Sequence, residues 1–458
     1  MAVHVSRELL EKHDKSGPRY TSYPTAPVWT SGFGPDGYGE ALQELAARQG
    51  DELSLYLHLP FCAKHCHYCG CHAIVSRDKD AVDRYLDRVE REVDMVVDVI
   101  GRGRRVVQLH WGGGTPNYLK NPQAERALGI FRDRFDVAPE AEISLEIDPR
   151  IGSPEQAAFL RGLGFNRISM GVQDFAMDVQ VAIGRKQSLE RTLRVFHGCR
   201  DAGFEGVNVD LVYGLPGQTR ESFTETLSVI IENQPDRVAC FSYAHVPWVK
   251  PNQEKVDTTH MVSGYEKFEL FQLTIAMFEA AGYDWIGIDH FAKREDELSV
   301  ALRERRLHRN FMGYTTRPAP HMLAFGMSGI GDVADRFAQN VPDLQKWGDT
   351  VDAGVLPVVR GHKLSADDRM RRSAILNLMC NNELPWDLTT AEFGAPANEL
   401  LADGLAAMKP YEDEGFVEML PDRLRITELG RHFARNVCME LDAYLDRNSD
   451  KPLFSRTV

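Results

Sequence analysis

Residues 51–250 alternate between predicted strands and predicted helices, and this rhythm restricts the fold more than any other feature of the 458-residue sequence. The strand segments alternate apolar and polar side chains, and the segments between them carry apolar residues at helical spacing. The predicted strands are 53–59, 106–112, 142–148, 167–173, 206–213 and 237–245. The predicted helices are 80–100, 122–135, 154–163, 188–202 and 220–232. Successive strand–helix units predict an α/β fold with a parallel sheet and helices outside it, in a barrel that is not fully closed.

Two further parts flank the predicted barrel. Residues 1–50 are predicted to form an irregular N-terminal arm, because 17–25 are polar and aromatic with two prolines, and its Arg19 and two tyrosines could instead face a ligand. Further α/β sequence, with a strand at 284–290, extends the barrel domain over 51–355. Residues 356–458 are predicted to form a mostly helical C-terminal domain, with helices at 367–382, 397–414 and 428–446 and a short strand at 423–427.

Polar residues share one face of the predicted strands. In the first strand, leucines occupy positions 53, 55, 57 and 59, whereas Ser54, Tyr56 and His58 point to the opposite face. The polar faces of later strands carry Ser144, Glu146, Asp148, Arg167, Ser169, Gln173, Asn208 and Asp210. Helices cover the apolar faces, so the polar residues are expected to line the lumen, where unpaired carboxylates are costly. We therefore expect a polar ligand there; an open sheet with a solvated polar face is the alternative, disfavoured because parallel sheets are usually covered on both faces.

Composition narrows the classes of partner. The net charge of −14 argues against broad binding to nucleic acid or to an anionic membrane. The N-terminal residues are charged and lack the apolar core of a signal peptide, and no apolar run is long enough to span a bilayer. We therefore expect a cytoplasmic protein with reduced thiols, in which disulfides are disfavoured and clustered cysteines favour metal binding.

Four of the eight cysteines lie within residues 62–71, directly after the first predicted strand. The others, Cys199, Cys240, Cys380 and Cys438, are scattered and are expected to be buried as small apolar residues. The cluster allows three interpretations. Structural zinc usually uses two well-separated ligand pairs, although His65, His67 and His72 could substitute for thiols here. A dithiol redox site would use Cys66 and Cys69 and leave two thiols without a role, and the third interpretation is an iron–sulfur cluster.

The spacing C-x3-C-x2-C lets one loop supply thiolates to three corners of a [4Fe–4S] cube, which leaves the fourth iron for a small molecule. Cys62, Cys66, Tyr68 and Cys69 match the C-x3-C-x-aromatic-C signature of the radical S-adenosylmethionine (SAM) superfamily. Residues 111–116, Trp-Gly-Gly-Gly-Thr-Pro, follow the second strand and are similar to the glycine-rich motif that binds the methionyl amine in that superfamily.

Further motifs along nearly the whole chain narrow the resemblance. They are 17–24, the extra Gly70–Cys71, 146–149, 169–173, 208–210, 213–216, 243–245, 307–310 and 454–456. Together they resemble the oxygen-independent coproporphyrinogen III oxidases. The resemblance implies a partial (β/α)6 barrel with an N-terminal arm and a helical C-terminal domain. It also implies an oxidoreductase of haem synthesis that acts without oxygen and converts two propionates of coproporphyrinogen III into vinyls, giving protoporphyrinogen IX and carbon dioxide.

The mechanism that this resemblance implies uses one [4Fe–4S] cluster and one or two SAM molecules. The reduced cluster passes an electron to SAM, which splits into methionine and a 5′-deoxyadenosyl radical. The radical takes a hydrogen atom from a propionate β-carbon, carbon dioxide leaves, and one electron passes to an acceptor. The resemblance also implies a monomer that works with an electron donor and an electron acceptor, neither of which the sequence identifies.

The resemblance assigns roles residue by residue. Cys62, Cys66 and Cys69 would ligate the cluster. Cys71 could be a fourth ligand, but the family leaves that iron for SAM and keeps this cysteine as a non-ligand, for which a role in catalysis is the alternative. Tyr56 would also take part in catalysis. The first SAM would contact Tyr56, Gly113, Glu146 and Ile330. A second SAM would contact Tyr68, Gly114, Thr115, Gln173, Arg185, Asp210 and Ala244. Gln173 and Asp210 could instead be internal hydrogen-bonding residues. The four carboxylates of the substrate require basic residues, for which Arg19, Arg185, Lys186 and Arg309 are the candidates.

The chain departs from the family pattern at two positions. Met312 stands where a glutamine is usual, and Lys186 replaces an acidic residue after Arg185. Two other functions compete with the enzyme. One is a radical-SAM-like haem chaperone without decarboxylase activity, a class that typically lacks both Cys71 and the Arg-Tyr-Thr-Ser-Tyr-Pro arm that this chain has. The other is a zinc-stabilised binding protein.

Overall fold

The computed structural model describes residues 5–262, 264–445 and 454–457, and within them strands β1 to β6 pair in parallel and in chain order. Their bounds are β1 Leu53–Leu59, β2 Arg104–Gly113, β3 Phe135–Ile147, β4 Arg167–Gln173, β5 Gly206–Tyr213 and β6 Arg237–Ser242. The predicted bounds of β1, β4 and β5 are confirmed. β2 and β3 begin earlier than predicted, and β6 ends three residues sooner, at Ser242 rather than at 245. The parallel sheet predicted for residues 51–250 is therefore confirmed.

The sheet continues on the far side of β1 instead of closing there. β11 (His321–Phe325) pairs in parallel with β1, and β12 (Ile330–Val333), β13 (Arg336–Asn340) and β14 (Val358–Lys363) follow in antiparallel order. Because β1 lies between β2 and β11, its two edges are both occupied, so β6 cannot close the barrel against it. The barrel is thus open, as predicted, but β11 to β14 were not predicted as strands.

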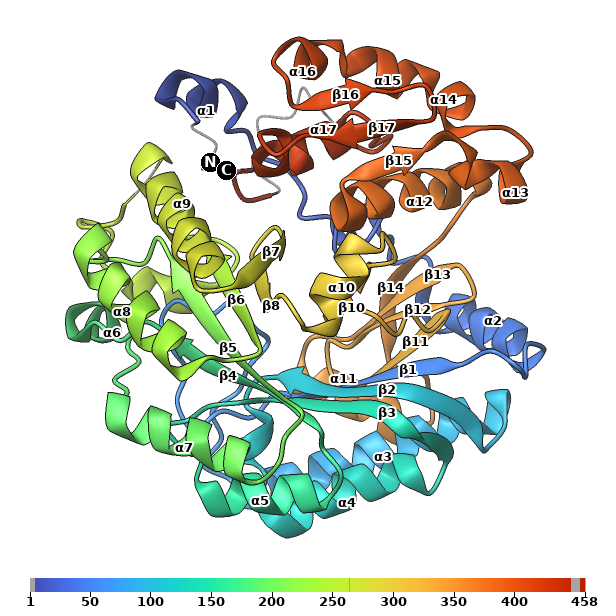
Figure 1. Cartoon of the computed structure of the whole chain (residues 1–458). Coiled ribbons are helices and arrows are strands. Elements are labelled where there is room, and N and C mark those ends of the chain that lie inside the picture. The colour runs from blue at the N-terminus through green and yellow to red at the C-terminus, as the bar shows by residue number, and fades with distance from the viewer. Residues whose placement is uncertain (1–4, 263, 446–453, 458) are drawn as a thin grey trace. The chain divides into compact units, whose positions relative to one another are not determined.

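Helices cover the outside of this sheet. They are α2 Gly34–Ala46, α3 Ala81–Ile100, α4 Asn121–Arg132, α5 Pro154–Gly162, α6 Met177–Ala182, α7 Leu189–Asp201, α8 Arg220–Asn233 and α11 Leu344–Asp352. Figure 1 shows α3, α4, α5 and α7 side by side along the sheet. Side-chain caps determine several helix starts: Ser153, Ser188 and Thr219 each accept a hydrogen bond from a backbone N–H three residues later. No helix among the described residues is both long and apolar enough to cross a membrane.

The polar faces of the strands form a connected network, as the alternation predicts. The Ser54 hydroxyl donates to the Gln108 side chain (3.1 Å), and the Gln108 amide donates to Glu142 (3.0 Å). Glu142 also accepts from the Arg167 guanidinium at 3.0 Å. The leucines on the opposite face of β1 are fully buried. The polar lumen is therefore real, and its charged groups satisfy one another at this end of the strands.

The chain divides into two compact units whose bounds differ from the predicted domains at 1–50, 51–355 and 356–458. One unit comprises 30–262 and 319–363 and holds the sheet from β14 to β6; we call it the barrel unit. The other comprises 1–29, 263–318 and 364–458. Its elements are α1 Arg7–His13, α9 Gly264–Ala280, β7 Tyr283–Gly287, β8 His290–Lys293, α10 Glu297–Arg303, β9 His308–Asn310, β10 Gly313–Thr315, α12 Ala366–Asn381, β15 Glu383–Pro385, α13 Thr390–Phe393, α14 Ala397–Leu400, α15 Ala402–Ala407, α16 Lys409–Asp413, β16 Val417–Met419, β17 Arg423–Ile426 and α17 Ala434–Met439.

The N-terminal arm is more ordered than predicted. It contains α1 in one unit and α2 in the barrel unit. Tyr20 and Tyr23 are buried in the hydrophobic core shared with the C-terminal helices, and the Tyr20 hydroxyl donates to Asp442 at 3.0 Å. The Tyr23 hydroxyl accepts from the backbone N–H of Ala443, also at 3.0 Å. The two tyrosines therefore stabilise the packing of the arm, and the suggestion that they face a ligand is wrong.

Two predicted C-terminal helices are also wrong. Residues 397–414 form three short helices, α14, α15 and α16, because Pro410 cannot donate the backbone hydrogen bond that would continue α15 into α16. The described part of 428–446 holds a 3-10 turn at Gly430–Phe433 and α17, which ends at Met439. Residue 446 lies outside the described residues. The predicted strand at 284–290 is a hairpin instead, since Ile288, with a φ of 41°, turns the chain between β7 and β8.

Candidate functional site

The cysteine loop connects β1 to α3 and is fixed at its two ends by backbone hydrogen bonds. Cys62 donates to the carbonyl of Ile74 (2.9 Å), and Ile74 donates to the carbonyl of Pro60 (2.7 Å). The loop after β2 joins them, because Thr115 donates to the carbonyl of Phe61 (2.9 Å). The loop thus leaves the carboxyl end of β1 in the place where parallel α/β sheets carry their chemistry.

The thiols of this loop meet polar side chains from several strands. The Sγ of Cys62 lies 3.1 Å from the Thr115 hydroxyl, and burial raises the pKa of this thiol to about 11. The Sγ of Cys66 accepts from the guanidinium groups of Arg150 (3.5 Å) and Arg185 (3.6 Å). Two guanidinium groups therefore adjoin Cys66 and would offset the negative charge of a metal–thiolate centre there.

Cys69 and Cys71 lie in different environments although they are only two residues apart. Hydrogen bonds from the Cys71 thiol and from His65 lower the pKa of Cys69 to about 5. The backbone N–H of Cys71 also points to the Sγ of Cys69, at 3.4 Å. The same thiol hydrogen bond raises the pKa of Cys71 well above its ordinary value, and Cys71 is exposed. Cys69 is therefore prepared as a thiolate, whereas Cys71 keeps its proton.

One carboxylate holds the two arginines beside Cys66. Asp148, at the end of β3, accepts from Arg150 at 2.6 Å and from Arg185 at 3.2 Å. Burial alone would raise the pKa of Asp148, but the two guanidinium groups hold it below its usual value. Arg185 is only 6% exposed and also donates to the carbonyl of Gly171 at 2.6 Å. Its Nε is a buried donor without a hydrogen-bond partner among the described residues, as expected of a group that meets a ligand.

The thiols fit the cluster that the resemblance implies better than they fit one metal ion. No three His, Cys, Asp or Glu side chains of the described residues are arranged to hold a single ion, which gives the zinc interpretation no support. Three cysteines in one loop, one of them with a strongly lowered pKa and one beside two guanidinium groups, suit separate irons of an anionic cluster. The donor set and its surrounding charge therefore fit a [4Fe–4S] cluster.

The glycine-rich loop after β2 packs closely on the end of β1. A Cβ on Gly114 would lie 2.5 Å from the backbone of Pro60. Gly113 has a φ of +110°, and a Cβ there would lie 2.5 Å from the ring of His58. Larger residues are excluded at both positions because a backbone and a buried ring cannot move aside. The loop therefore brings its backbone against the cysteine loop, as a motif that binds a small molecule beside the cluster requires.

Tyr56 and Glu146 of the predicted first SAM site lie together in the lumen with a residue that was not predicted. The Tyr56 ring stacks on His110, with ring centroids 6.0 Å apart. His110 accepts or donates at the Ser144 hydroxyl (2.8 Å), and its other ring nitrogen lies 3.8 Å from the Glu146 carboxylate. Gly112 adjoins both groups, since a Cβ there would lie 3.2 Å from Glu146 and from the Tyr56 hydroxyl. These groups offer acceptors and an aromatic face to a polar ligand.

Asp210 lies on β5 in the same lumen. It accepts from the Ser169 hydroxyl at 3.0 Å, and burial, reinforced by the charge of Glu146, raises its pKa to about 7. The Oδ1 of Asn208, two residues earlier on the same face, is a buried acceptor for which the described residues supply no donor. Uncompensated buried oxygens of this kind indicate a place where a ligand supplies donors.

The other predicted second-SAM residues surround the cysteine loop. Gln173 ends β4 with a φ of +69°, a conformation that non-glycine residues adopt rarely and often at functional sites. Tyr68 packs against the apolar cluster around Val179 and Tyr243. The carbonyl of Ala244, just beyond β6, accepts from the Gln253 side chain at 3.3 Å. Together with Gly114, Thr115, Arg185 and Asp210, all of these residues belong to the barrel unit.

Ile330 begins β12 after a turn that α3 holds in place. Glu92 of α3 is 2% exposed and accepts from the backbone N–H of Gly326 (2.9 Å), from the Asn340 amide (2.6 Å) and from the Trp347 indole (3.3 Å). One helical face thus fixes the turn before Ile330 through a carboxylate. Burial raises the pKa of Glu92 to about 7.

The raised pKa of Glu92 predicts a pH-dependent stability. Its unfolded pKa is about 4.3, so the folded state holds the proton more tightly. Its contribution is complete below about pH 4 and is lost as pH rises towards 7. We expect denaturant titration to give the wild type an unfolding free energy about 2 kcal/mol higher at pH 5.5 than at pH 8 from this group. Glu92→Gln should lack that component, and equal pH dependence in both proteins would contradict the assignment.

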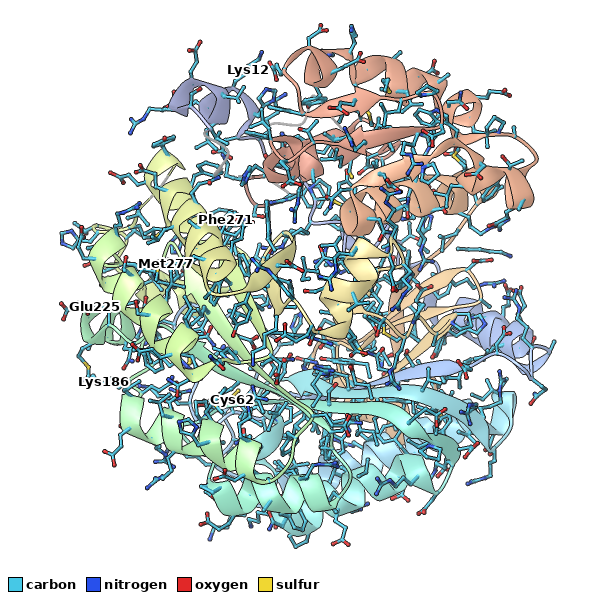
Figure 2. The ribbon with its side chains drawn as sticks, in the orientation of Figure 1. Lys12, Cys62, Lys186, Glu225, Phe271 and Met277 are labelled. Carbon is cyan, nitrogen blue, oxygen red and sulfur yellow. The ribbon has the colours of Figure 1, made fainter. Side chains whose placement is uncertain are left out.

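The basic residues proposed for substrate carboxylates lie in different surroundings. Arg19 forms an ion pair with Asp289, and its carbonyl accepts from Arg309 at 3.0 Å. Arg309 also lies over the Tyr314 ring, 5.2 Å from the centroid. Lys186 is exposed at the outer edge of the barrel unit (Figure 2). Met312 lies in the turn of the β9–β10 hairpin, where its N–H donates to Asn310 at 2.9 Å.

Arg150, His110 and Glu92 were not predicted as functional residues from the sequence. Arg150 could have been predicted, because it follows Asp148 by two residues and a buried carboxylate needs a cationic partner. His110 continues the polar face of the predicted strand 106–112 and could have been included. Glu92 offered the weaker signal of a carboxylate within the apolar face of α3, next to Val89 and Val93.

Family models and curated relatives of one kind match this chain, and the relatives match it over nearly its whole length. A model of the Radical SAM superfamily matches residues 56–230, and a model of the HemN C-terminal domain matches residues 364–433. The chain is 42% identical to the oxygen-independent coproporphyrinogen III oxidase of Synechocystis sp., covering 100% of this chain and 98% of that protein. It is 41% identical to the oxygen-independent coproporphyrinogen III oxidase of Escherichia coli, covering 98% of each.

A solved structure gives the same result. The structure of coproporphyrinogen III oxidase HemN from E. coli, described as a Radical SAM enzyme, matches with a TM-score of 0.91 and 39% identity over 97% of this chain and 100% of that chain. The predicted α/β class, with a partial Radical SAM barrel and a mostly helical C-terminal domain, is confirmed. The chain belongs to the family of oxygen-independent coproporphyrinogen III oxidases within the Radical SAM superfamily.

Proposed function

We propose that this chain catalyses the oxygen-independent oxidative decarboxylation of two propionates of coproporphyrinogen III to vinyls, giving protoporphyrinogen IX. Relatives at 41–42% identity that carry this name match nearly every residue of the chain. The observation that carries the proposal is the cysteine loop: Cys62, Cys66 and Cys69 lie at the carboxyl end of β1, against the glycine-rich loop after β2. The same elements hold the polar lumen that a charged cosubstrate needs.

Cys62, Cys66 and Cys69 would each ligate one iron of a [4Fe–4S] cluster and leave the fourth iron without a protein ligand. With SAM bound, such a cluster would supply the radical chemistry that removes a hydrogen atom from a propionate β-carbon. Arg150 and Arg185 offset the negative charge at Cys66 through their hydrogen bonds to its Sγ. The N–H of Cys71 donates to the Sγ of Cys69 and stabilises its thiolate.

Four residues would hold the first SAM in the lumen. Glu146 offers a carboxylate to an ammonium or a hydroxyl, and Tyr56 lies beside it over His110. Gly113 leaves its backbone accessible because it carries no side chain at a position where a Cβ would meet His58. Ile330 supplies an apolar contact from the start of β12, in a turn that Glu92 holds. The chemistry of these side chains at their positions supports the roles that the resemblance implies.

A second SAM would bind the set Tyr68, Gly114, Thr115, Gln173, Arg185, Asp210 and Ala244. The unpartnered Nε of Arg185 suits a carboxylate, and the raised pKa of Asp210 falls when ribose hydroxyls donate to it. Equilibrium binding of SAM to the reconstituted chain measures whether this second site is filled. We propose that Cys71 and Tyr56 contact the reacting groups, because Cys71 is exposed next to the proposed ligand Cys69 and the Tyr56 hydroxyl adjoins Glu146.

The substrate carries four carboxylates and needs cationic partners in a chain of net charge −14. Arg19, Arg185, Lys186 and Arg309 are the proposed partners. Each turnover at one propionate releases carbon dioxide, one hydrogen atom and one electron, and leaves a vinyl. The hydrogen atom goes to the deoxyadenosyl group and the electron to an acceptor. An electron donor is also needed to reduce the cluster. The proposed partners are therefore one electron donor and one electron acceptor.

We further propose that the enzyme works as a monomer in the cytoplasm and without oxygen. Cys62, Cys66, Cys69 and Cys71 form no disulfide, and they need a reducing compartment to stay available for iron. A cluster with one iron open to a small molecule is also sensitive to oxygen, which matches an anaerobic step.

Anaerobic reconstitution followed by a product assay tests this function. The purified chain is loaded with iron and sulfide, supplied with reductant, SAM, an electron acceptor and coproporphyrinogen III, and its products are separated by chromatography. We expect about four irons per chain and conversion of the substrate into protoporphyrinogen IX. A loaded protein that leaves the substrate unchanged while binding haem stoichiometrically would instead be a haem chaperone.

A further inference from the structure

The backbone carbonyls of the cysteine loop converge on one side chain far along the chain. The Nδ2 of Asn252 lies 3.3 Å from the carbonyl oxygen of Cys66, 2.9 Å from that of His67 and 2.9 Å from that of Cys69. A primary amide has two N–H donors, so the three carbonyls share them. Carbonyls of residues 66, 67 and 69 can meet at one nitrogen only if the chain curls around it, and Cys69 closes that curl by donating to the carbonyl of Cys66 (3.3 Å).

The neighbouring residue holds the remaining carbonyl of the curl. The Nε2 of Gln253 donates to the carbonyl of Tyr68 (2.8 Å) and to that of Ala244 (3.3 Å), and its Oε1 accepts from the N–H of Val246 (2.6 Å). Gln253 is 1% exposed, so its amide is fixed from both sides. Every carbonyl from residue 66 to residue 69 is therefore hydrogen-bonded to Asn252 or to Gln253.

The location of the two amides explains how they reach the loop. They lie in the 3-10 turn Pro251–Lys255 after β6, in which Pro251 occupies the first turn and fixes its backbone. Because the two residues are consecutive in this turn, Asn252 reaches the carbonyls of residues 66, 67 and 69, and Gln253 reaches that of residue 68. The two amides therefore join the loop after β1 to the segment after β6, across the barrel unit.

We propose that Asn252 is a positioning residue for the iron–sulfur cluster. By drawing the carbonyl oxygens of the 66–69 curl to its amide, it keeps their negative ends away from the thiolates and sets the spacing of Cys66 and Cys69. On the sulfur side, the N–H of Cys71 donates to the Sγ of Cys69 (3.4 Å). Without the amide, the carbonyls of His67 and Cys69 lose their donor, that of Cys66 keeps only the N–H of Cys69, and the curl relaxes. This inference rests on the proposed cluster and adds the residue that holds its ligands in place.

The test measures how long the reconstituted holoenzyme retains iron, so it does not depend on catalysis. Wild type, Asn252→Ala, Asn252→Asp and Asn252→Gln are loaded with iron and sulfide, and the rate of iron transfer to an excess chelator is followed anaerobically. We expect Asn252→Ala to release iron about tenfold faster than wild type. Asn252→Asp keeps the shape but replaces the donor by an acceptor, so it should release iron at least as fast. Asn252→Gln keeps the donor and should recover part of the retention.

Asn233→Ala is the matched control, because Asn233 also donates its amide to a carbonyl, that of Val229 at 2.8 Å, but within α8. It should retain iron like wild type. The electron paramagnetic resonance spectrum of the reduced cluster should change in the Asn252 alanine and aspartate variants and not in the control.

Equal release rates and spectra in wild type, Asn252→Ala and Asn252→Asp would overturn the inference, as would loss of iron in Asn233→Ala to the same degree. If the alanine variant does not fold, the aspartate and glutamine variants decide by the same comparison. A wild-type chain that binds no cluster overturns the proposed function as well, whereas a wild-type cluster with indifferent Asn252 variants overturns this inference alone.

Discussion

Alanine at Cys62, Cys66 or Cys69 is expected to abolish the cluster, whereas alanine at Cys71 is expected to leave iron content near the wild-type value and to lower activity. Cys62 adjoins the Thr115 hydroxyl, and Cys66 adjoins two guanidinium groups. Cys69 accepts hydrogen bonds from two donors. All of these partners suit metal-bound thiolates. Cys71 is exposed and keeps its proton. Iron and sulfide analysis after anaerobic reconstitution, together with the absorbance of the cluster, measures the difference.

The buried Cys199 provides a matched control for this series. It lies in α7, away from the loop, and Cys199→Ala should change neither iron content nor turnover. Equal loss of iron in all four loop variants would show that Cys71 is a ligand. Full activity in Cys71→Ala would show that it has no part in the reaction.

Replacing Asp148 with alanine is expected to destabilise the protein by about 3–5 kcal/mol, the second large effect. Its carboxylate lies between the guanidinium groups of Arg150 and Arg185 in a buried setting, so its loss leaves two charges unpaired. The same charges adjoin Cys66, and we expect weaker iron retention as a consequence. Denaturant titration of the reconstituted protein measures the stability, and chelator competition measures the retention.

Asp352 is the control, because it also bridges two arginines, Arg88 at 2.6 Å and Arg91 at 2.7 Å. Its side chain is 37% exposed, so solvent screens the pair and Asp352→Ala should cost about 1 kcal/mol or less. If both alanine variants lose the same free energy and keep the same iron, then burial of the Asp148 network does not matter and the account of this network is wrong.

Strict alternation made the first half of the fold predictable. The bounds of β1, β4 and β5 agree with the prediction because apolar and polar residues alternate throughout β1 and β4 and as far as Leu211 in β5. The same alternation placed Tyr56, Glu146 and Asp210 on the lumen face, and the spacing of Cys62, Cys66 and Cys69 pointed to their chemistry. Local pattern was sufficient because each of these features lies within one strand or one loop.

The elements that were not predicted depend on contacts between residues far apart in the sequence, or contain residues that only weakly favour a helix or a strand. Helix α2 begins with Gly34 and contains two more glycines, which are poor helix formers, so tertiary packing determines it. β11 pairs with β1 across more than 250 residues, and no local pattern predicts such a pairing. The hydrogen bonds of Asn252 and Gln253 to the cysteine loop also join residues far apart in sequence. Arrangements of this kind become visible only in three dimensions.

Isotope transfer tests the central claim most directly. The reconstituted enzyme is incubated anaerobically with reductant, SAM, an electron acceptor and coproporphyrinogen III that carries deuterium at the propionate β-carbons, and the 5′-deoxyadenosine formed is analysed by mass spectrometry. The account predicts that protoporphyrinogen IX appears together with 5′-deoxyadenosine that has gained deuterium. Complete conversion of the substrate with only unlabelled 5′-deoxyadenosine, or deuterium transfer without any vinyl product, would contradict it.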